Sequence, residues 1–185
     1  QHQTNCDLTP GSMKVSDNPD DADHFKRYVE KLNTDYDYEH ISCLSETEVF
    51  EMLHSPLFKG GGTLDVGGMH LHPLNYALGL AKAAKDAGAD IYEHSRVINY
   101  SKHQPSTVTT EKGQVVADHI VLACNAYLDK LERRIAGKIM PVNNFMLATE
   151  PLEESEADFI NRDNVCVHDN KFHIHYFRMS ADNRL

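Results

Sequence analysis

Two pairs of closely spaced histidines are the first residues in this chain whose types and spacing could support chemistry. The chain holds 12 histidines, and His70 with His72, like His173 with His175, stand two residues apart. In an extended segment this spacing places both imidazoles on one face, a pattern that metal sites use. No carboxylate or thiolate stands at ligand spacing beside either pair, and His72 immediately precedes Pro73. We therefore expect no metal site, and histidines that are hydrogen-bonded at strand edges or in a substrate cleft.

Neither serine nor cysteine stands in a pattern typical of a nucleophile. The G-x-S-x-G elbow of serine hydrolases does not occur, and chance explains the serines that stand near histidines, which are Ser42, Ser45 and Ser55. The four cysteines are Cys6, Cys43, Cys124 and Cys166. They are far apart and show no C-x-x-C spacing, which disfavours a zinc site or a redox pair. Reduced thiols in a cytoplasmic protein are the better interpretation.

A glycine cluster at Gly60–Gly62 invites comparison with the phosphate-binding loop of dinucleotide-binding domains. That loop has the pattern G-x-G-x-x-G, follows a strand and opens a helix. Here the cluster follows Lys59 and leads into Thr63–Val66, a run typical of a strand. The 185 residues therefore contain no such fingerprint, although the segment after Gly67 is typical of the later part of a dinucleotide-binding domain.

The elements that must position any functional residue begin with a helix between Pro73 and Gly88. Proline is tolerated in the first helical turn, and glycine is common in the left-handed cap that ends a helix. Apolar residues recur at intervals of three and four and form one stripe, which predicts packing of this helix against a sheet. The stripe consists of Leu74, Ala77, Leu78, Ala81, Ala84 and Ala87.

Strands are predicted after this helix. Ala89–Tyr92 is a short candidate, and Arg96–Tyr100 and Ser106–Thr110 alternate as strands should. A hairpin is expected around Glu111–Gln114. Ile120–Cys124 is apolar without alternation, which is typical of a strand covered on both faces in a parallel sheet.

The patterns outside this region predict further helices and strands. A helix over Ala22–Asn33 directs Phe25, Val29 and Leu32 inward. Ser45 and Glu48 form a capping box that starts a second helix, which Pro56 ends. The remaining segments are an acidic helix at 153–160 and strands at 139–149, 165–167 and 171–179.

Composition excludes several classes of partner. The chain has 18 basic and 28 acidic side chains and a net charge of −10, which disfavours nucleic acids and anionic membranes and is compatible with a cationic substrate. No apolar run approaches the roughly 20 residues of a membrane-spanning helix. Gln1–Asn5 has neither a basic start nor an apolar core, so no secretory signal is expected there.

The order of these elements, with several short motifs, resembles the D-amino-acid oxidase-like superfamily of FAD-dependent oxidoreductases. The motifs are Gly67–Pro73, Ala87–Ile91, Ser95–Val97, Val116–Tyr127 and Phe177–Leu185. Within the superfamily the chain is most similar to the members that oxidise gamma-glutamylputrescine and related amines, on the residues Cys6–Leu8, Met69–Pro73 and Asp182–Leu185. Cys124–Tyr127 departs from the Ala-Gly-Ala-Trp that family members often carry at this point.

The resemblance implies a fold of the α+β or α/β class. We expect a fragment of a two-lobe enzyme, with the distal part of a Rossmann-like FAD lobe and an antiparallel-sheet substrate lobe. In this interpretation residues 67–133 belong to the FAD lobe, residues 1–66 supply substrate-lobe helices and a connecting strand, and residues 134–185 supply substrate-lobe strands.

The resemblance also implies roles for individual residues. Val97 stands where backbone groups of family members bind the adenine of FAD, and three residues at the end of the predicted buried strand stand beside the cofactor: Ala123, Cys124 and Asn125. In the strand 171–179, alternation places His173 and His175 on one face and Tyr176 and Arg178 on the other. These four are the candidate substrate-binding residues, and no catalytic acid or base is obligatory.

The implied activity is oxidation of an amine or amino acid by hydride transfer to FAD, with reoxidation by dioxygen. The 185 residues alone are expected to bind FAD weakly, to be inactive and to self-associate through the surface around Ile120–Ala123 that a missing first βαβ unit leaves uncovered. The alternative is a cofactor-free α+β binding or interaction module derived from the same fold.

Overall fold

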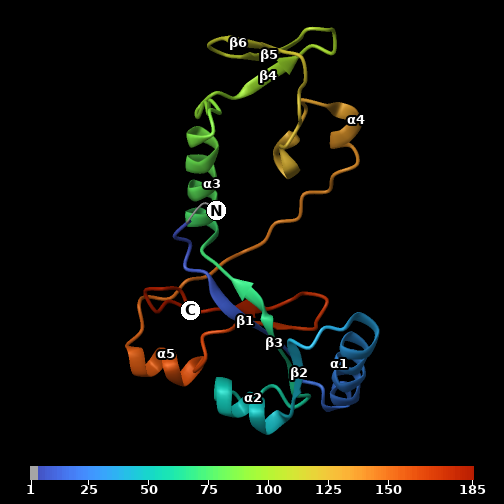
Figure 1. The fold of residues 1–185 in the computed structure, drawn as a ribbon, viewed down its shortest axis with the longest axis vertical. Coiled ribbons are helices and arrows are strands. Elements are labelled where there is room, and N and C mark those ends of the chain that lie inside the picture. The colour runs from blue at the N-terminus through green and yellow to red at the C-terminus, as the bar shows by residue number, and fades with distance from the viewer. Residues whose placement is uncertain (1–3) are drawn as a thin grey trace. The chain divides into compact units, whose positions relative to one another are not determined.

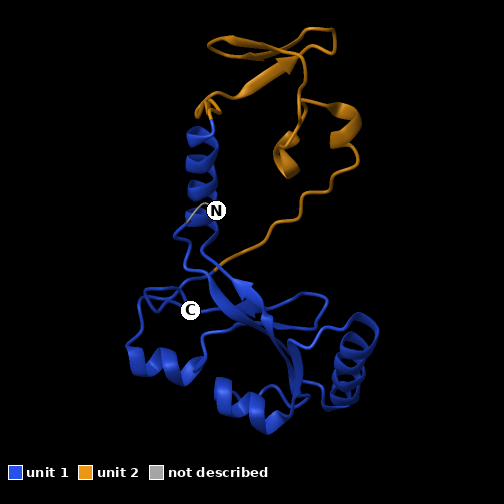
Figure 2. Ribbon diagram, viewed as in Figure 1, with its two compact units in different colours: residues 1–87, 147–185 blue, residues 88–146 orange. Residues whose placement is uncertain are grey.

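A computed structural model describes residues 4–185, which divide into two compact units (Figure 2). Unit 1 comprises residues 1–87 and 147–185, and unit 2 comprises residues 88–146. Residues 1–3, part of the segment in which no secretory signal is expected, lie outside the described residues. The units are defined by packing and not by function, so the assignment of residues 67–133 to a FAD lobe stays a prediction. Within the described residues, no helix has the length and apolar character needed to span a bilayer.

Unit 1 is built on a five-stranded mixed sheet of order β2-β3-β1-β7-β8 (Figure 1). Its strands are β1 (Thr9–Val15), β2 (Ile41–Leu44), β3 (Gly62–His70), β7 (Cys166–Asp169) and β8 (Tyr176–Phe177). β1 pairs with β7 in parallel, and every other pair is antiparallel. The early and late parts of the chain therefore meet in the middle of one sheet.

Helix α1 (Ala22–Tyr36) confirms the first predicted helix. It follows the short 3-10 helix η1 (Pro19–Asp21) and buries Phe25 and Val29. Its last turn ends at Asp37, which adopts a left-handed conformation. The inward face predicted from the sequence is thus the face that packs.

Helix α2 (Glu46–Leu53) confirms the predicted capping box. The Ser45 hydroxyl accepts a hydrogen bond from the Glu48 N–H, and the Glu48 carboxylate accepts one from the Ser45 N–H. The buried side chains of α2 join those of β1, β7 and the turn before β7 in the hydrophobic core of unit 1, which consists of Met13, Val15, Val49, Met52, Leu53, Val165 and Val167. The acidic helix predicted at 153–160 is also confirmed, as α5 (Glu154–Ile160).

Helix α3 (Pro73–Asp86) confirms the predicted helix but not its predicted packing. Gly88 has φ +94°, the left-handed conformation expected where the helix ends. The apolar stripe, however, buries no side chain among the described residues, and Leu74 and Leu78 are about as exposed as polar surface residues. The prediction that this helix packs against a sheet is wrong for the described residues, because no described strand covers the apolar stripe.

Unit 2 contains a three-stranded antiparallel sheet of order β4-β5-β6. The strands are β4 (Val97–Tyr100), β5 (Ser106–Thr110) and β6 (Gln114–Ala117), and Thr109 opposite Gln114 closes the predicted hairpin. The 3-10 helix η2 (Asn125–Leu128) and the short helix α4 (Arg133–Ala136) follow. The strands and hairpin predicted between residues 96 and 114 are confirmed.

Three predicted strands are wrong: Ala89–Tyr92, Ile120–Cys124 and 139–149 are irregular. A strand needs a neighbour for its backbone N–H and C=O groups, and none of the described strands pairs with these segments. Val121 is 87% exposed, and Ile120, Leu122 and Cys124 are only partly buried, so the described residues do not cover the apolar run on both faces.

The long strand predicted at 171–179 is also wrong, since only Tyr176–Phe177 is a strand. The Asp169 carboxylate accepts hydrogen bonds from the backbone N–H groups of Lys171 and His175. An aspartate that bonds the backbone ahead of it favours a turn over a strand. The segment between β7 and β8 is therefore a loop closed by Asp169.

Candidate functional site

A cavity in unit 2 lies beside strand β4 and has a volume of about 500 Å³. We call it the β4 pocket. It brings together Val97 and Cys124, two of the predicted cofactor residues, from segments that are 27 positions apart in the chain. Ala123 and Asn125 flank Cys124 in the chain but do not line this cavity. The other lining residues are Arg96, Ile98, Asn99, Glu111, Tyr127, Leu128, Asp129, Lys130 and Leu131.

A polar network around Glu132 joins the two chain segments that supply most of the lining of the β4 pocket. The Glu132 carboxylate accepts hydrogen bonds from Lys102 Nζ at 2.5 Å, from Tyr100 Oη at 2.6 Å and from the Arg134 N–H at 3.2 Å. These bonds, the one from Lys102 first, lower the pKa of Glu132 from 4.5 to about 2. Because Tyr100 belongs to β4 and Glu132 caps α4, the network ties the chain segment after Tyr127 to the strand that carries Val97.

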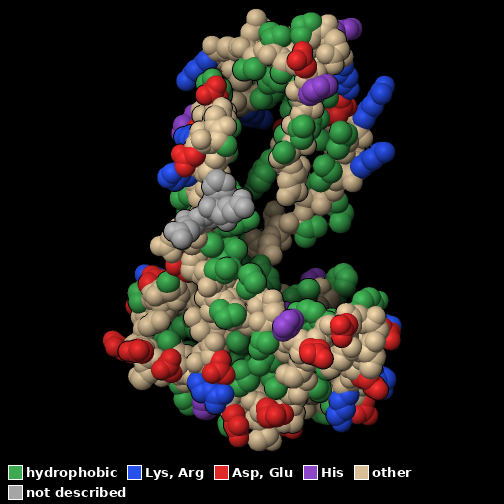
Figure 3. Space-filling model, in the orientation of Figure 1, with side chains coloured by type: hydrophobic (Ala, Val, Ile, Leu, Met, Phe, Trp, Pro, Cys, Tyr) green, Lys and Arg blue, Asp and Glu red, His purple; other side chains and the backbone are tan. Residues whose placement is uncertain are grey.

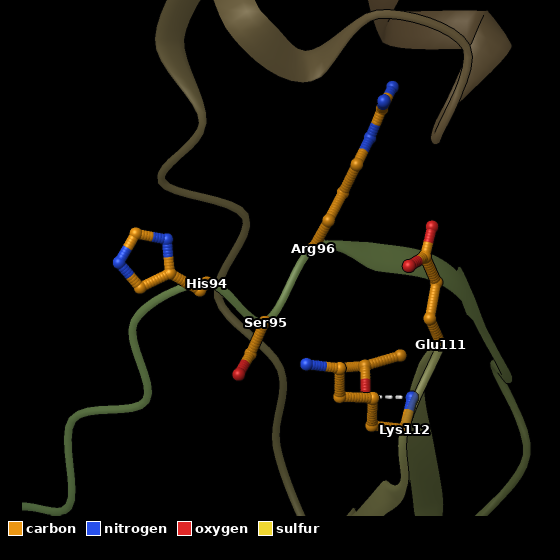
Figure 4. A pocket seen from close by; sticks show the side chains of 6 residues that line it. His94, Ser95, Arg96, Glu111 and Lys112 are labelled. Carbon is orange, nitrogen blue, oxygen red and sulfur yellow. Dashed lines mark hydrogen bonds between the residues drawn. The ribbon is translucent and has the colours of Figure 1, made fainter.

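A smaller cavity of about 270 Å³ shares Arg96 and Glu111 with the β4 pocket (Figure 4). In Figure 4 the side chains of Arg96 and Glu111 extend to one side, and the Ser95 hydroxyl points to the other. Arg96 also forms a long ion pair with Asp129, with 3.7 Å between Nη2 and Oδ2, and both side chains are exposed. Such a pair contributes little to stability, so the guanidinium can turn toward a ligand.

The sequence interpretation missed Arg96 and Glu111 as lining residues. The hairpin register contained the necessary signal, because Val97 opposite Thr110 places the neighbouring residues Arg96 and Glu111 side by side. No local sequence pattern predicts that Leu128 and Asp129 line the β4 pocket, since their position depends on the turn that follows Cys124.

The β4 pocket suits one end of a dinucleotide. β4 is an edge strand, so one row of its backbone N–H and C=O groups has no strand partner in the described part of the chain. Such an edge can bind the donor and acceptor atoms of a flat heterocycle such as adenine. Gly67 and Gly68 lie inside β3 and do not form a phosphate loop, so the assignment of Val97 to the adenine of FAD stays a prediction.

In unit 1 the predicted substrate residues separate onto two sides of β8. His175 and Phe177 line a cavity of about 310 Å³, together with Val15 and Val167. Successive residues of a strand point to opposite faces, so Tyr176 faces away from this cavity. Arg178 follows the end of β8 and is not among the residues that line the cavity. His173 lies in the loop before β8, exposed and edge-on to Phe172 with 5.1 Å between the ring centroids. Of the four candidates, only His175 lines this cavity.

His175 is bound by a carboxylate at the rim of that cavity. Its Nδ1 lies 2.7 Å from Asp169 Oδ2. Burial raises the pKa of Asp169, but the hydrogen bonds from the His175 ring and N–H outweigh burial and the net pKa is lowered. Lys171 and Asp17 form a second pair nearby at 2.7 Å. Each of these two carboxylates, Asp169 and Asp17, therefore has a hydrogen-bonded partner within unit 1.

Arg178 has a different environment. Its Nη1 lies 3.4 Å from Nδ1 of the buried His70, and it forms no ion pair with a carboxylate in residues 4–185. Asp182, four positions further along the chain, accepts hydrogen bonds from Ser180 and Arg184. Arg178 is thus a half-buried positive charge without a negative partner in the described residues.

The histidine pairs considered for metal binding have other contacts. His72 caps α3, where its Nδ1 accepts a hydrogen bond from the Asn75 N–H at 3.2 Å. His70 contacts Asn164 and Arg178, and His175 contacts Asp169. Among the described residues, no three side chains of the histidine, cysteine, aspartate or glutamate type converge as a metal site requires.

A family profile and two similar curated proteins are all described as oxidoreductases. A sequence profile described as "DAO: FAD dependent oxidoreductase" matches residues 1–185. The chain is 35% identical over 190 residues to the probable oxidoreductase OrdL of Haemophilus influenzae and 34% identical over 186 residues to the gamma-glutamylputrescine oxidoreductase of Escherichia coli. All of this chain is covered in both cases, but only 44% and 43% of the relatives, so it spans less than half of their length.

Solved structures agree on the fold. Glycine oxidase from Geobacillus kaustophilus superposes with a TM-score of 0.73 at 20% identity and covers 98% of this chain and 48% of its own. L-proline dehydrogenase from P. horikoshii gives the same TM-score at 17% identity, and the match covers 98% of this chain and 49% of the dehydrogenase chain. At this level of identity the likeness shows a common fold, and it confirms the predicted mixed architecture.

Proposed function

Because this chain belongs to the DAO family of FAD-dependent oxidoreductases, we propose that the full-length protein oxidises a small-molecule amine. The substrate proposed is gamma-glutamylputrescine or an amine like it, which carries a carboxylate at the end far from the oxidised nitrogen. One observation of the structure supports this choice: Arg178 is half-buried and has no carboxylate partner in residues 4–185. A guanidinium in this state is suited to a bidentate contact with a substrate carboxylate.

The residues of unit 2 hold the cofactor in this proposal. The free edge of β4 at Val97 binds the adenine ring through backbone groups, and the segment Ala123–Asn125, of which Cys124 lines the β4 pocket, lies beside the cofactor. When bound, FAD accepts a hydride from the carbon next to the amine nitrogen, and dioxygen is the final acceptor. In this arrangement the 185 residues alone hold FAD weakly and are inactive, since they contain no G-x-G-x-x-G turn.

The residues of unit 1 hold the substrate. Arg178 and Tyr176, two positions apart at and just after β8, orient the far end of the amine, which leaves the reacting carbon to be placed by the rest of the site. His175 is the weaker candidate, because its ring is already bound to Asp169 on the opposite side of β8. We also propose a cytoplasmic location, since all four cysteines are free thiols.

The proposal is tested with the full-length protein. It is expected to purify with bound FAD, and anaerobic addition of gamma-glutamylputrescine is expected to bleach the flavin absorbance, with colour returning on admission of air. Absence of flavin after reconstitution would support the alternative, a cofactor-free binding module. Bound flavin that this amine does not bleach would overturn the substrate.

The β4 pocket is tested by two substitutions at one position. Cys124→Trp fills the cavity beside Val97 and is expected to reduce the flavin content severely, whereas Cys124→Ala leaves the cavity open and is expected to retain it. The ratio of flavin to protein absorbance measures both. Equal flavin contents in the two variants would show that the cofactor does not occupy this pocket.

A further inference from the structure

The half-buried guanidinium of Arg178 has one described side-chain contact, the imidazole of His70. We infer that His70 is a positioning residue: it orients Arg178 so that the remaining N–H groups of the guanidinium form a subsite for the substrate carboxylate. This inference rests on the proposed amine oxidoreductase function. It restricts the substrate class to amines that bear a carboxylate at their far end.

The hydrogen bonds of His70 assign a single tautomer. Nε2 lies 2.8 Å from the backbone carbonyl of Asn164. A carbonyl only accepts, so Nε2 carries the hydrogen, and in the neutral imidazole Nδ1 is then left with a lone pair. Nδ1 lies 3.4 Å from Arg178 Nη1, a group that only donates. His70 is therefore aligned to accept from Arg178 and cannot repel it in this state.

The carbonyl that sets this alignment belongs to a rigid turn. The buried side chain of Asn161 donates to the Val165 carbonyl at 2.7 Å and accepts from the Val165 N–H at 3.2 Å. The Asn164 N–H donates to the Asn161 carbonyl at 3.0 Å, and Asn164 itself has a left-handed conformation with φ +46°. Since Val165 belongs to the core of unit 1, the core holds the Asn164 carbonyl in place. The hydrogen bond to this carbonyl in turn fixes the orientation of the His70 ring.

The arrangement leaves most of the guanidinium available. His70 uses one N–H of Arg178 and leaves the others in a planar fork, which matches the two oxygens of a carboxylate. His70 is the last residue of β3 and Arg178 directly follows β8 of the same sheet, so the fork is held in place before the substrate binds. Preorganisation of this kind lowers the entropy cost of binding.

The decisive test replaces His70 by two amides in the full-length protein. The asparagine amide reaches about as far as Nδ1 and can still accept from Arg178, whereas the glutamine amide reaches as far as Nε2 and keeps only the contact with Asn164. His70→Gln is expected to raise KM for gamma-glutamylputrescine about tenfold with little change in kcat, and His70→Asn is expected to change it about threefold or less. Both should leave KM unchanged for the analogue whose carboxylate is converted to a primary amide. Equal effects of both variants on both amines would make His70 merely structural and overturn the inference.

A double substitution keeps the test valid if one variant is unstable. Arg178→Lys is expected to raise KM for the carboxylate-bearing amine, and His70→Gln added to it should have no further effect, because His70 acts through Arg178. If Arg178→Lys raises KM for the carboxylate-bearing amine but His70→Gln does not, the role of His70 is refuted and the Arg178 subsite is retained. No rise with either would refute the subsite itself.

Failure of the proposed activity can be told apart from failure of this inference. If neither amine is oxidised, calorimetry still compares pentanoate with pentanamide on the same protein. Tighter binding of pentanoate that is lost in both His70→Gln and Arg178→Lys supports the carboxylate subsite without any turnover. Equal binding of the two compounds refutes it.

Discussion

Unit 1 and unit 2 belong to one chain but are stabilised by different interactions. Among the described residues, Leu128 is the only buried apolar side chain in unit 2, whereas the others all belong to unit 1. Unit 1 therefore has a hydrophobic core, and unit 2 relies on the hairpin ladder and on the network around Glu132. Figure 3 shows apolar side chains at the surface in the part of the view that unit 2 occupies.

This difference in packing bears on the proposal that unit 1 binds the substrate and unit 2 binds the cofactor. The candidate substrate residues are attached to the well-packed unit, and the β4 pocket lies in the weakly packed one. Ligand-binding segments are often drawn from the less stable part of a protein. A cofactor that binds only the folded pocket would stabilise unit 2 more than unit 1 by mass action.

The largest expected contrast comes from the same substitution in each unit. Met13 is fully buried in the core of unit 1, and Met140 is 82% exposed in unit 2. Met13→Ala is expected to lower the free energy of unfolding by about 2–5 kcal/mol through the lost burial and the cavity left behind. Met140→Ala should change it by about 0.5 kcal/mol or less. Urea unfolding followed by circular dichroism measures both, and similar losses would contradict the described difference in packing.

A second contrast uses two glycines. Gly11 in β1 has φ +102°, and an added Cβ would lie 2.5 Å from Val165 Cγ1, whereas nothing lies within 4 Å of a Cβ at Gly113. Gly11→Ala combines backbone strain with a clash in the core, so we expect a cost of about 1–3 kcal/mol. Gly113→Ala, in the hairpin of unit 2, is expected to cost about 0.5 kcal/mol or less. Equal midpoints in urea for the two variants would show that β1 can shift away from Val165.

Sequence reasoning succeeded where the signal is local. The capping box at Ser45, the proline and glycine at the ends of α3, and the hairpin at Glu111–Gln114 each depend on residues close in the chain, and all three formed. It failed where a segment depends on a distant neighbour. The apolar run Ile120–Cys124 has the composition of a buried strand, but strand formation also requires a paired neighbour, which sequence cannot supply by itself.

The candidate site divides in the same way. Register along β4 and β5 could have predicted that Arg96 and Glu111 lie together, because a hairpin fixes its own pairing. The contact of His70 with Arg178 joins residues 108 positions apart, and no local pattern announces it. The loop before β8 was missed because one carboxylate, that of Asp169, bonds the backbone at Lys171 and His175.

The exposed apolar surface of unit 2 predicts self-association of the 185-residue chain. Val121 is 87% exposed in unit 2, and Val66 is 58% exposed in unit 1. Val121→Asp is expected to weaken association severalfold, because a charge must be desolvated at the contact, and Val66→Asp should have no effect. Sedimentation velocity over a range of concentrations measures this. A strict monomer at every concentration, or equal effects of both substitutions, would contradict association through unit 2.

The smallest effect expected is a local response of unit 2 to acid. The bonds from Lys102 and Tyr100 lower the pKa of Glu132 from 4.5 to about 2. A carboxyl group whose pKa is lower in the folded state stabilises that state above its ordinary pKa, and the contribution is lost as pH falls toward the folded value.

Between about pH 5 and about pH 2, the network around Glu132 should therefore loosen. The Arg134 amide, which donates to Glu132 Oε1, reports this as a loss of protection from hydrogen exchange beyond the intrinsic change with pH. Glu132→Gln should show the same low protection at every pH. Glu48 in unit 1 is the matched control, because hydrogen bonds from Ser45 lower its pKa as well. Helix α2 also buries Val49, Met52 and Leu53. Protonation of Glu48 should therefore leave the amides of α2 protected from hydrogen exchange. If α2 loosened as much as the segment around Glu132, hydrophobic burial would not be the feature that separates the two units.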